Sequence, residues 1–144
     1  MMTTVADVMT RNVMGIEEKA SIMDALKKMK KLRIGCLVVV DGKEAIGILT
    51  DADILFKVVS EEKNLSKITV GKIMSKPLIT ISPDASIDDA AKLMTMNRIK
   101  KLPVVGESGK LIGIITATDL IAHSPEFSDI LLQMKPPGGA TFGA

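Results

Sequence analysis

The sequence contains two similar copies of one segment of about fifty-five residues. Residues 5–59 align with residues 70–124 at an offset of 65, which becomes 66 after a one-residue insertion near Ser108. Roughly twenty of about fifty-five aligned positions are identical, far more than unrelated segments share. Each copy alone is near the lower size limit for a stable domain, so the two copies are expected to fold together. The repeat therefore predicts a pseudo-twofold pair with clefts between its halves, where ligands often bind.

Both copies show the same order of local patterns. Ser86-x-x-Asp89 is typical of a capping box, and apolar residues follow it at the i, i+3, i+4, i+7 spacing of an amphipathic helix; Ser21-x-x-Asp24 begins the same pattern in the first copy. A β-rich run precedes each helix, two apolar strands joined by a Gly-containing turn follow it, and a Thr begins a second helix. The unit is therefore β-α-β-β-α, and the fold class is α+β. The expected strands of the second copy are 77–81, 102–105 and 111–115.

The repeat boundaries predict a simple domain layout. We expect a first repeat over 1–59, a polar and exposed linker over 60–69, a second repeat over 70–124, a short helix over 125–135 and a disordered tail over 136–144.

Composition excludes several classes of protein. The net charge of +2 is too small to indicate nucleic acid or an anionic membrane as partner, and the absence of Trp and Tyr removes most stacking platforms for bases. No apolar run reaches the roughly 18 residues of a membrane span, and the N-terminus lacks a secretory signal. The lone Cys36 fits a reducing, cytoplasmic location, and the single His leaves no metal-binding cluster.

The segments 47–53 (GILTDAD) and 113–119 (GIITATD) carry the functional hypothesis. Each is a strand that leads into a helix, so backbone N–H groups and the positive end of the helix dipole favour phosphate there. A nearby hydroxyl adds a donor for phosphate, and a carboxylate accepts both hydroxyls of a ribose. Taken alone, however, Thr-x-x-Asp is also a capping box in which the Asp only accepts the N-cap backbone N–H.

The tandem β-α-β-β-α units and the Gly-hydrophobic-hydrophobic-Thr-x-x-Asp ending resemble CBS domains, which are named after cystathionine β-synthase. The resemblance covers residues 5–124. It implies a regulatory pair, without catalysis, that binds adenosine-containing ligands (AMP, ADP, ATP or S-adenosylmethionine) in clefts between the repeats. It also implies that the motif Asp binds ribose and the motif Thr binds phosphate. These roles map onto Asp53 and Asp119, and onto Thr50, Thr116 and Thr118.

The resemblance implies an adenine site upstream of the motifs. That site comprises Asn12, Val13, Met14 and Ile34 in the first copy, and Pro77, Leu78, Ile79 and Ile99 in the second; plain core packing explains Ile34 and Ile99 nearly as well. Basic residues before the middle strand often face phosphate in this family. The second copy has Lys100 and Lys101 there, whereas the first has Gly35 and Cys36. We therefore expect the second motif to bind phosphate-bearing ligands more tightly.

Two interpretations of the pair remain open at this stage. One is a sensor that binds an adenosine compound and signals to a regulated protein; the other is a purely structural dimerisation module with degenerate clefts. Both include a homodimer, with the apolar residues of 127–134 as a contribution to its interface. No catalytic triad, P-loop or GxGxxG pattern indicates an enzyme, and no cofactor other than the regulatory ligand is expected.

Overall fold

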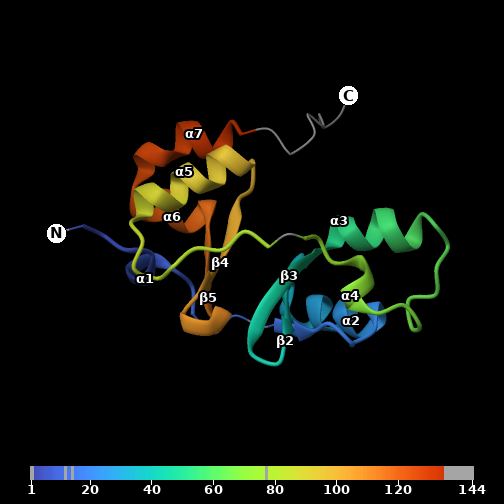
Figure 1. Cartoon of the computed structure of the whole chain (residues 1–144). Coiled ribbons are helices and arrows are strands. Elements are labelled where there is room, and N and C mark those ends of the chain that lie inside the picture. The colour runs from blue at the N-terminus through green and yellow to red at the C-terminus, as the bar shows by residue number, and fades with distance from the viewer. Residues whose placement is uncertain (1, 12, 14, 77, 135–144) are drawn as a thin grey trace. The chain divides into compact units, whose positions relative to one another are not determined.

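The structure is a computed structural model, and it describes residues 2–11, 13, 15–76 and 78–134 (Figure 1). The chain forms two compact units. The first comprises the described residues of Met1–Asn12, Ile79–Glu107 and Leu111–Ala144, and the second comprises those of Val13–Leu78 and Ser108–Lys110. The units do not coincide with the sequence repeats, because residues 2–11 pack with the second repeat.

The second unit contains a three-stranded sheet in the order β1-β2-β3. Strand β1 (Gly15–Glu17) runs parallel to β2 (Cys36–Asp41), and β2 pairs with β3 (Glu44–Thr50) in antiparallel orientation. The helix α2 (Ile22–Leu32) connects the parallel pair, as such a crossover requires. Strand β3 leads directly into α3 (Asp51–Ile54) and a π-helical turn, η1 (Leu55–Val59).

The core of the second unit lies between the sheet and its helices. The buried face of α2 joins strand residues and α4 (Val70–Ile73) in one cluster that includes Ile22, Ala25, Met29, Leu37, Val39, Leu49, Val58 and Val70. Ser21 caps α2 by accepting the Asp24 backbone N–H at 3.0 Å, which confirms its predicted place as the N-cap residue.

The expected linker over 60–69 also contributes to the second unit. Its carbonyls at Leu65 and Ile68 accept the backbone N–H groups of Met23 and Ile22, each at 2.9 Å. The side chains of Leu65 and Ile68 are partly buried against the core, whereas its Lys and Glu residues are exposed. The linker therefore satisfies the N-terminal donors of α2, which a merely exposed connection does not do.

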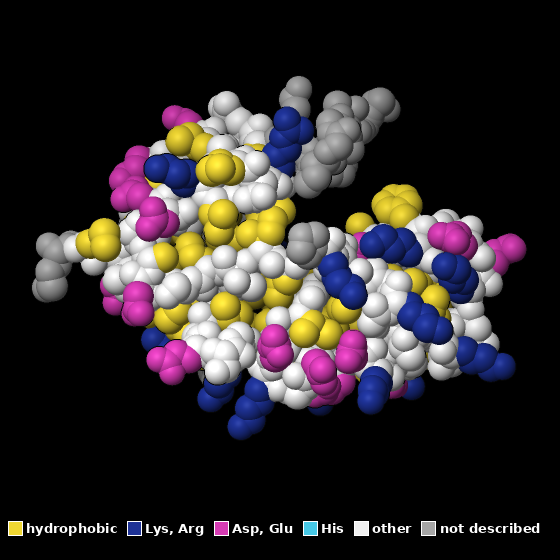
Figure 2. All heavy atoms as spheres, viewed as in Figure 1, with side chains coloured by type: hydrophobic (Ala, Val, Ile, Leu, Met, Phe, Trp, Pro, Cys, Tyr) yellow, Lys and Arg dark blue, Asp and Glu magenta, His cyan; other side chains and the backbone are white. Residues whose placement is uncertain are grey.

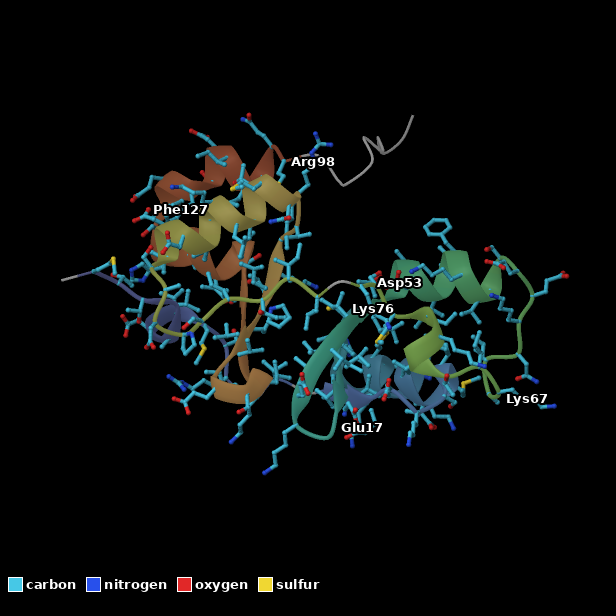
Figure 3. All side chains as sticks on the ribbon, viewed as in Figure 1. Glu17, Asp53, Lys67, Lys76, Arg98 and Phe127 are labelled. Carbon is cyan, nitrogen blue, oxygen red and sulfur yellow. The ribbon has the colours of Figure 1, made fainter. Side chains whose placement is uncertain are left out.

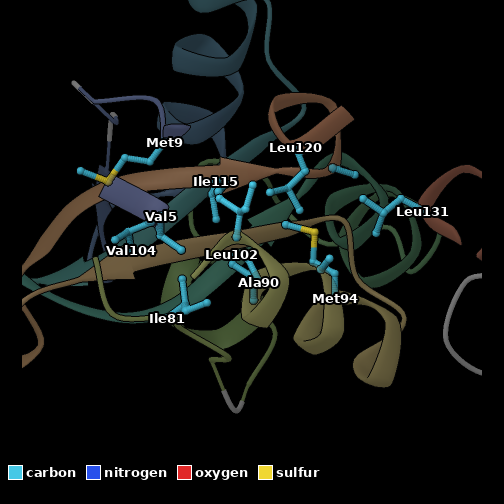
Figure 4. Close-up of a cluster of buried hydrophobic side chains, with 13 residues drawn as sticks. Val5, Met9, Ile81, Ala90, Met94, Leu102, Val104, Ile115, Leu120 and Leu131 are labelled. Carbon is cyan, nitrogen blue, oxygen red and sulfur yellow. The ribbon is translucent and has the colours of Figure 1, made fainter. Parts of the chain in front are cut away.

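The first unit has a two-stranded sheet covered by helices. Strand β4 (Lys101–Val105) pairs with β5 (Leu111–Thr116) in antiparallel orientation; the 3-10 turn η2 (Glu107–Gly109) lies between them in the chain. The helices are α1 (Val5–Val8), α5 (Ile87–Asn97), α6 (Ala117–His123), the 3-10 turn η3 (Pro125–Phe127) and α7 (Ser128–Leu132). Figure 4 shows their shared core, with side chains from α1, both strands, α5, α6 and α7.

The expected strand over 77–81 is the first correction. Pro77 lies outside the described residues, residues 78–80 form no strand, and Ile81 forms only an isolated parallel bridge with Val104. The cause is Pro103, which stands where Val38 stands in the first repeat. Its carbonyl accepts from the Ile81 N–H at 3.1 Å, so its nitrogen faces the same segment but has no proton to donate.

The C-terminal segment is the second correction. The predicted helix over 125–135 is present in its described part as η3 and α7, but its apolar residues are not all surface residues. Leu131 is 0% exposed and Phe127 packs against the core of the first unit, while Ile130 remains exposed. Leu131 is therefore a core residue of its own chain and is not available to a dimer interface.

Candidate functional site

The first motif copy lies at the junction of β3 and α3. Thr50 is the N-cap: its Oγ1 accepts the Asp53 N–H at 3.1 Å, and its own N–H donates to Asp53 Oδ2 at 3.0 Å. Asp53 is only 9% exposed, and it also accepts the Ser75 hydroxyl at 3.1 Å (Oδ1) and 3.3 Å (Oδ2). Lys57 Nζ lies 3.0 Å from Asp53 Oδ1. Figure 3 labels Asp53 on the α3 helix.

The second copy has the same capping box but fewer partners. Thr116 Oγ1 accepts the Asp119 N–H at 3.0 Å, and the Thr116 N–H donates to Asp119 Oδ2 at 3.0 Å. The Thr10 hydroxyl lies 3.4 Å from the same oxygen, near the limit for a hydrogen bond. Among the described residues, no donor reaches Oδ1 of Asp119 and no cation pairs with this carboxylate. Asp119 is half-buried.

Each motif is completed by a segment from the other repeat. Thr10 forms a bridge with Ile114 in β5, and Ser75 forms the matching bridge with Ile48 in β3. The motif glycines permit this approach. A Cβ on Gly113 would lie 2.9 Å from the Thr10 carbonyl oxygen, and one on Gly47 would lie 3.3 Å from that of Ser75. A Cβ would also lie 2.7 Å from Met9 Sδ at Gly113 and 2.6 Å from Met74 Sδ at Gly47, so a side chain at either position requires its neighbours to shift.

Thr10 and Ser75 belong to the candidate site, and the sequence interpretation did not include them. A signal for them was available, because both copies place a hydroxyl residue between Met and a basic residue: Met9-Thr10-Arg11 and Met74-Ser75-Lys76. The pairing itself was not readable from the sequence, since each hydroxyl meets the Asp of the other repeat.

The structure distributes the upstream candidates between the two units. Asn12, Met14 and Pro77 lie outside the described residues. Val13 and Leu78 fall in the unit of Asp53, while Ile79 and Ile99 fall in the unit of Asp119 and pack against its core. Ile34 is 41% exposed, so it is not a core residue of its unit.

The basic candidates lie beside the second motif. The Lys100 carbonyl accepts the Ala117 N–H at 2.8 Å, and Lys101 pairs with Thr116 in the β4-β5 ladder. The side chains of Lys100, Lys101 and Thr118 are exposed. The backbone of the first unit thus places two lysines next to the motif that contains Thr116, Thr118 and Asp119.

The second unit has no lysine at the equivalent positions, Gly35 and Cys36, and it has an acid, Asp51, where the first unit has Ala117. The Asp51 N–H donates to the Gly35 carbonyl at 2.9 Å, which is the bond that Ala117 makes with Lys100. The Asp51 carboxylate lies over Gly35, because a Cβ there would be 2.7 Å from Asp51 Oδ2. The carboxylate of Asp51 therefore lies over the residue that corresponds to Lys100, and it repels phosphate at short range.

Comparison with known proteins decides the family. The CBS domain model matches residues 5–60 and again residues 70–126. The chain belongs to the CBS domain family. The α+β structure with two repeats agrees with solved CBS proteins, and the resemblance seen in the sequence is confirmed.

The curated relatives of this chain differ in length, so the chain covers different shares of them. An uncharacterized protein of Methanopyrus kandleri is 38% identical over 85% of this chain, which spans 63% of that protein. The CBS domain-containing protein YhcV of Bacillus subtilis is 32% identical, with 85% of this chain and 86% of that protein covered. An inosine-5'-monophosphate dehydrogenase of Korarchaeum cryptofilum is 37% identical over 76% of this chain, which spans only 22% of the dehydrogenase.

Solved CBS structures show the same fold. The CBS domain pair of protein MJ0100, in complex with 5'-methylthioadenosine and S-adenosyl-L-methionine, is 29% identical with a TM-score of 0.76, and the match covers 88% of this chain and 98% of that chain. CBSX2 in complex with AMP is 27% identical with a TM-score of 0.73 and covers the same shares of the two chains. A hexameric CBS-CP12 protein from bloom-forming cyanobacteria is 30% identical, with a TM-score of 0.74, over 90% of this chain and 71% of that chain.

The described residues show neither a cluster of metal ligands nor a membrane-spanning helix. No group of three or more His, Cys, Asp or Glu side chains in the described part of the chain is placed to hold a metal ion. No helix within the described ranges is long and apolar enough to cross a membrane.

Proposed function

We propose that this CBS pair is a regulatory module that binds an adenosine-containing ligand, such as AMP, ADP, ATP or S-adenosylmethionine. The observation that carries the proposal is Asp119, whose Oδ1 meets no donor among the described residues. The two neighbouring hydroxyls of a ribose can both donate to such a carboxylate. The solved relatives that hold S-adenosyl-L-methionine with 5'-methylthioadenosine, or AMP, support an adenosine compound as the ligand class.

The charges beside Asp119 favour a ligand that carries phosphate. Lys100 and Lys101 are exposed and adjoin Thr116 and Ala117 through the backbone, and Thr118 adds an exposed hydroxyl. Charge-assisted hydrogen bonds from these groups are the usual way in which proteins hold phosphate oxygens. This combination supports AMP, ADP or ATP over an uncharged adenosine at the first unit.

The proposed role is regulation of another protein in the cytosol, without catalysis by this chain. The motif residues offer hydrogen bonds and charge, and none of them forms a nucleophile–base pair among the described contacts. The dehydrogenase relative shares only a small part of its length with this chain, so its activity gives no reason to propose an enzyme.

Thermal unfolding tests ligand binding directly. At a hundredfold excess over its dissociation constant, a ligand that binds only the folded state adds about 2.7 kcal/mol. We expect AMP, ADP, ATP or S-adenosylmethionine to raise Tm by several degrees for a chain of this size. The 2',3'-dideoxy analogue of the effective compound lacks the ribose diol and is the control, for which a much smaller shift is expected. No shift with any adenosine compound at millimolar concentration would favour the purely structural module.

The module is also proposed to act as a homodimer. Apolar side chains of the α3–η1 helix are exposed, with Phe56 at 67% and Leu55 at 53%, and Figure 2 shows hydrophobic side chains reaching the surface over this helix. An exposed apolar group of this kind is typical of an interaction surface. Light scattering at micromolar concentration is expected to give the mass of a dimer, and Phe56→Glu is expected to shift it toward the monomer. A monomer mass for the unmodified protein contradicts this part of the proposal.

A further inference from the structure

The two motif aspartates differ in how many acceptor positions they have left. A carboxylate offers about four lone-pair positions. Asp53 receives the Thr50 N–H, the single proton of the Ser75 hydroxyl and an N–H of Lys57, so about one position remains. Asp119 receives the Thr116 N–H and, at 3.4 Å, the Thr10 hydroxyl, which leaves about two. A ribose diol needs two positions, and only Asp119 can supply them.

Lys57 is the residue that makes this difference. The backbone N–H of Thr50 donates to Asp53 as that of Thr116 does to Asp119. The hydroxyl groups of Ser75 and Thr10 are likewise equivalent donors to Asp53 and Asp119. The position that follows the motif Asp by four residues is Lys57 in the first copy and His123 in the second. Among the described residues, His123 makes no ion pair or hydrogen bond with Asp119.

Two acceptors, one on Asp53 and one on Ile73, hold the ammonium group of Lys57 in place. Its Nζ lies 3.0 Å from Asp53 Oδ1 and also donates to the Ile73 carbonyl at 3.1 Å, at the end of α4. The i,i+4 spacing places the ammonium over the carboxylate within one helical turn. Because the Asp53 side chain is only 10% exposed, this ion pair is less screened by solvent than a surface pair. Lys57 therefore competes with a ligand hydroxyl for Oδ1.

We propose that Lys57 determines which motif copy binds ligand: it closes the first copy to ribose by occupying Asp53, while the absence of a lysine at position 123 leaves Asp119 open. This inference rests on the proposed function, since it concerns the same ligand class. Asp53 is then a structural residue that joins α3, Ser75 and, through Lys57, α4. The unmodified chain binds one adenosine ligand, at Asp119.

Substitutions at positions 57 and 123 test the inference. Isothermal titration with S-adenosylmethionine, which carries no phosphate for Asp51 to repel, is expected to give about one ligand per chain for the unmodified protein and about two for Lys57→Met. Asp119→Ala is expected to weaken binding about ten- to a hundredfold, and Asp119→Ala with Lys57→Met to restore about one tightly bound ligand per chain. Lys72→Met removes an exposed lysine from α4 and is the matched control, with no change expected. Circular dichroism establishes that each variant is folded.

The reverse substitution keeps the test decisive if Lys57→Met does not fold. His123→Lys puts an ammonium within reach of Asp119 and is expected to weaken binding about ten- to a hundredfold, as loss of a charge-assisted hydrogen bond does. Two ligands per unmodified chain, or unchanged stoichiometry in a folded Lys57→Met, overturns the inference while the proposed function stands. Unchanged affinity in His123→Lys overturns it as well. Absence of any binding by the unmodified protein overturns the proposed function, and the inference with it.

Discussion

Asp119→Ala is expected to lower the affinity for an adenosine ligand about ten- to a hundredfold and to change the stability of the free protein little. The ligand effect follows from the loss of the acceptor for both ribose hydroxyls, at about 1.5–3 kcal/mol. The stability effect is small because Thr116 still caps α6 and Asp119 is half-buried without an ion partner among the described residues. About 1 kcal/mol is the expected cost of the lost capping contact.

Asp53→Ala is expected to lower the stability of the free protein and to leave the affinity for ligand nearly unchanged. It leaves the Ser75 hydroxyl, the Thr50 N–H and the Lys57 ammonium without their acceptor in a nearly buried place. Unsatisfied buried groups cost about 1–3 kcal/mol, and because Lys57 is partly exposed we expect a total near 2–3 kcal/mol. Binding of AMP is expected to change little, since Lys57 already occupies Asp53.

Titration calorimetry and urea unfolding of the two variants separate these effects. Calorimetry gives the dissociation constant for AMP or ATP, and the urea midpoint at unchanged slope gives the free energy of unfolding. Equal losses of affinity, or a larger loss in Asp53→Ala, would show that the first motif also binds ligand. A large loss of stability in Asp119→Ala would show that its carboxylate is structural too.

The internal repeat made most of the fold predictable. The identity of the two copies indicates one β-α-β-β-α unit, and the capping residues Ser21 and Ser86 begin α2 and α5 as expected. Such local signals are readable because a cap and its partner lie three residues apart. The strand over 77–81 was wrong for a non-local reason: Pro103, more than twenty residues away, removes the donor that this strand needs.

The candidate site was predictable in its motif residues and not in their partners. Thr50, Asp53, Thr116 and Asp119 follow from the repeated Thr-x-x-Asp. Their difference in availability depends on Ser75, Lys57 and Thr10, of which only Lys57 is close to its motif in the sequence. An i,i+4 Asp–Lys pair is a common feature of helix surfaces, so the sequence alone gives it no special weight.

Leu131→Ala is expected to destabilise the protein by about 2–5 kcal/mol, the range for truncation of a buried Leu. Leu131 projects from α7 into the cluster that contains Met94 and Leu120 (Figure 4), and it is 0% exposed. The substitution removes contacts with α5 and α6 and leaves a cavity, because neighbours relax only partly around a deleted side chain. The short helix α7 has few other buried groups, so its docking depends mainly on this residue.

Ile130→Ala is the matched control on the same helix. Ile130 is 55% exposed, and a substitution at such a position usually changes stability by no more than about 0.5 kcal/mol. Urea unfolding of both variants, with light scattering at the same concentrations, distinguishes a core role from an interface role. A Leu131→Ala protein that keeps its stability but loses its dimer would return Leu131 to the interface. Loss of stability with an unchanged mass places α7 in the core of the first unit. There Leu131 packs with residues of α5 and α6, the helix that carries Asp119.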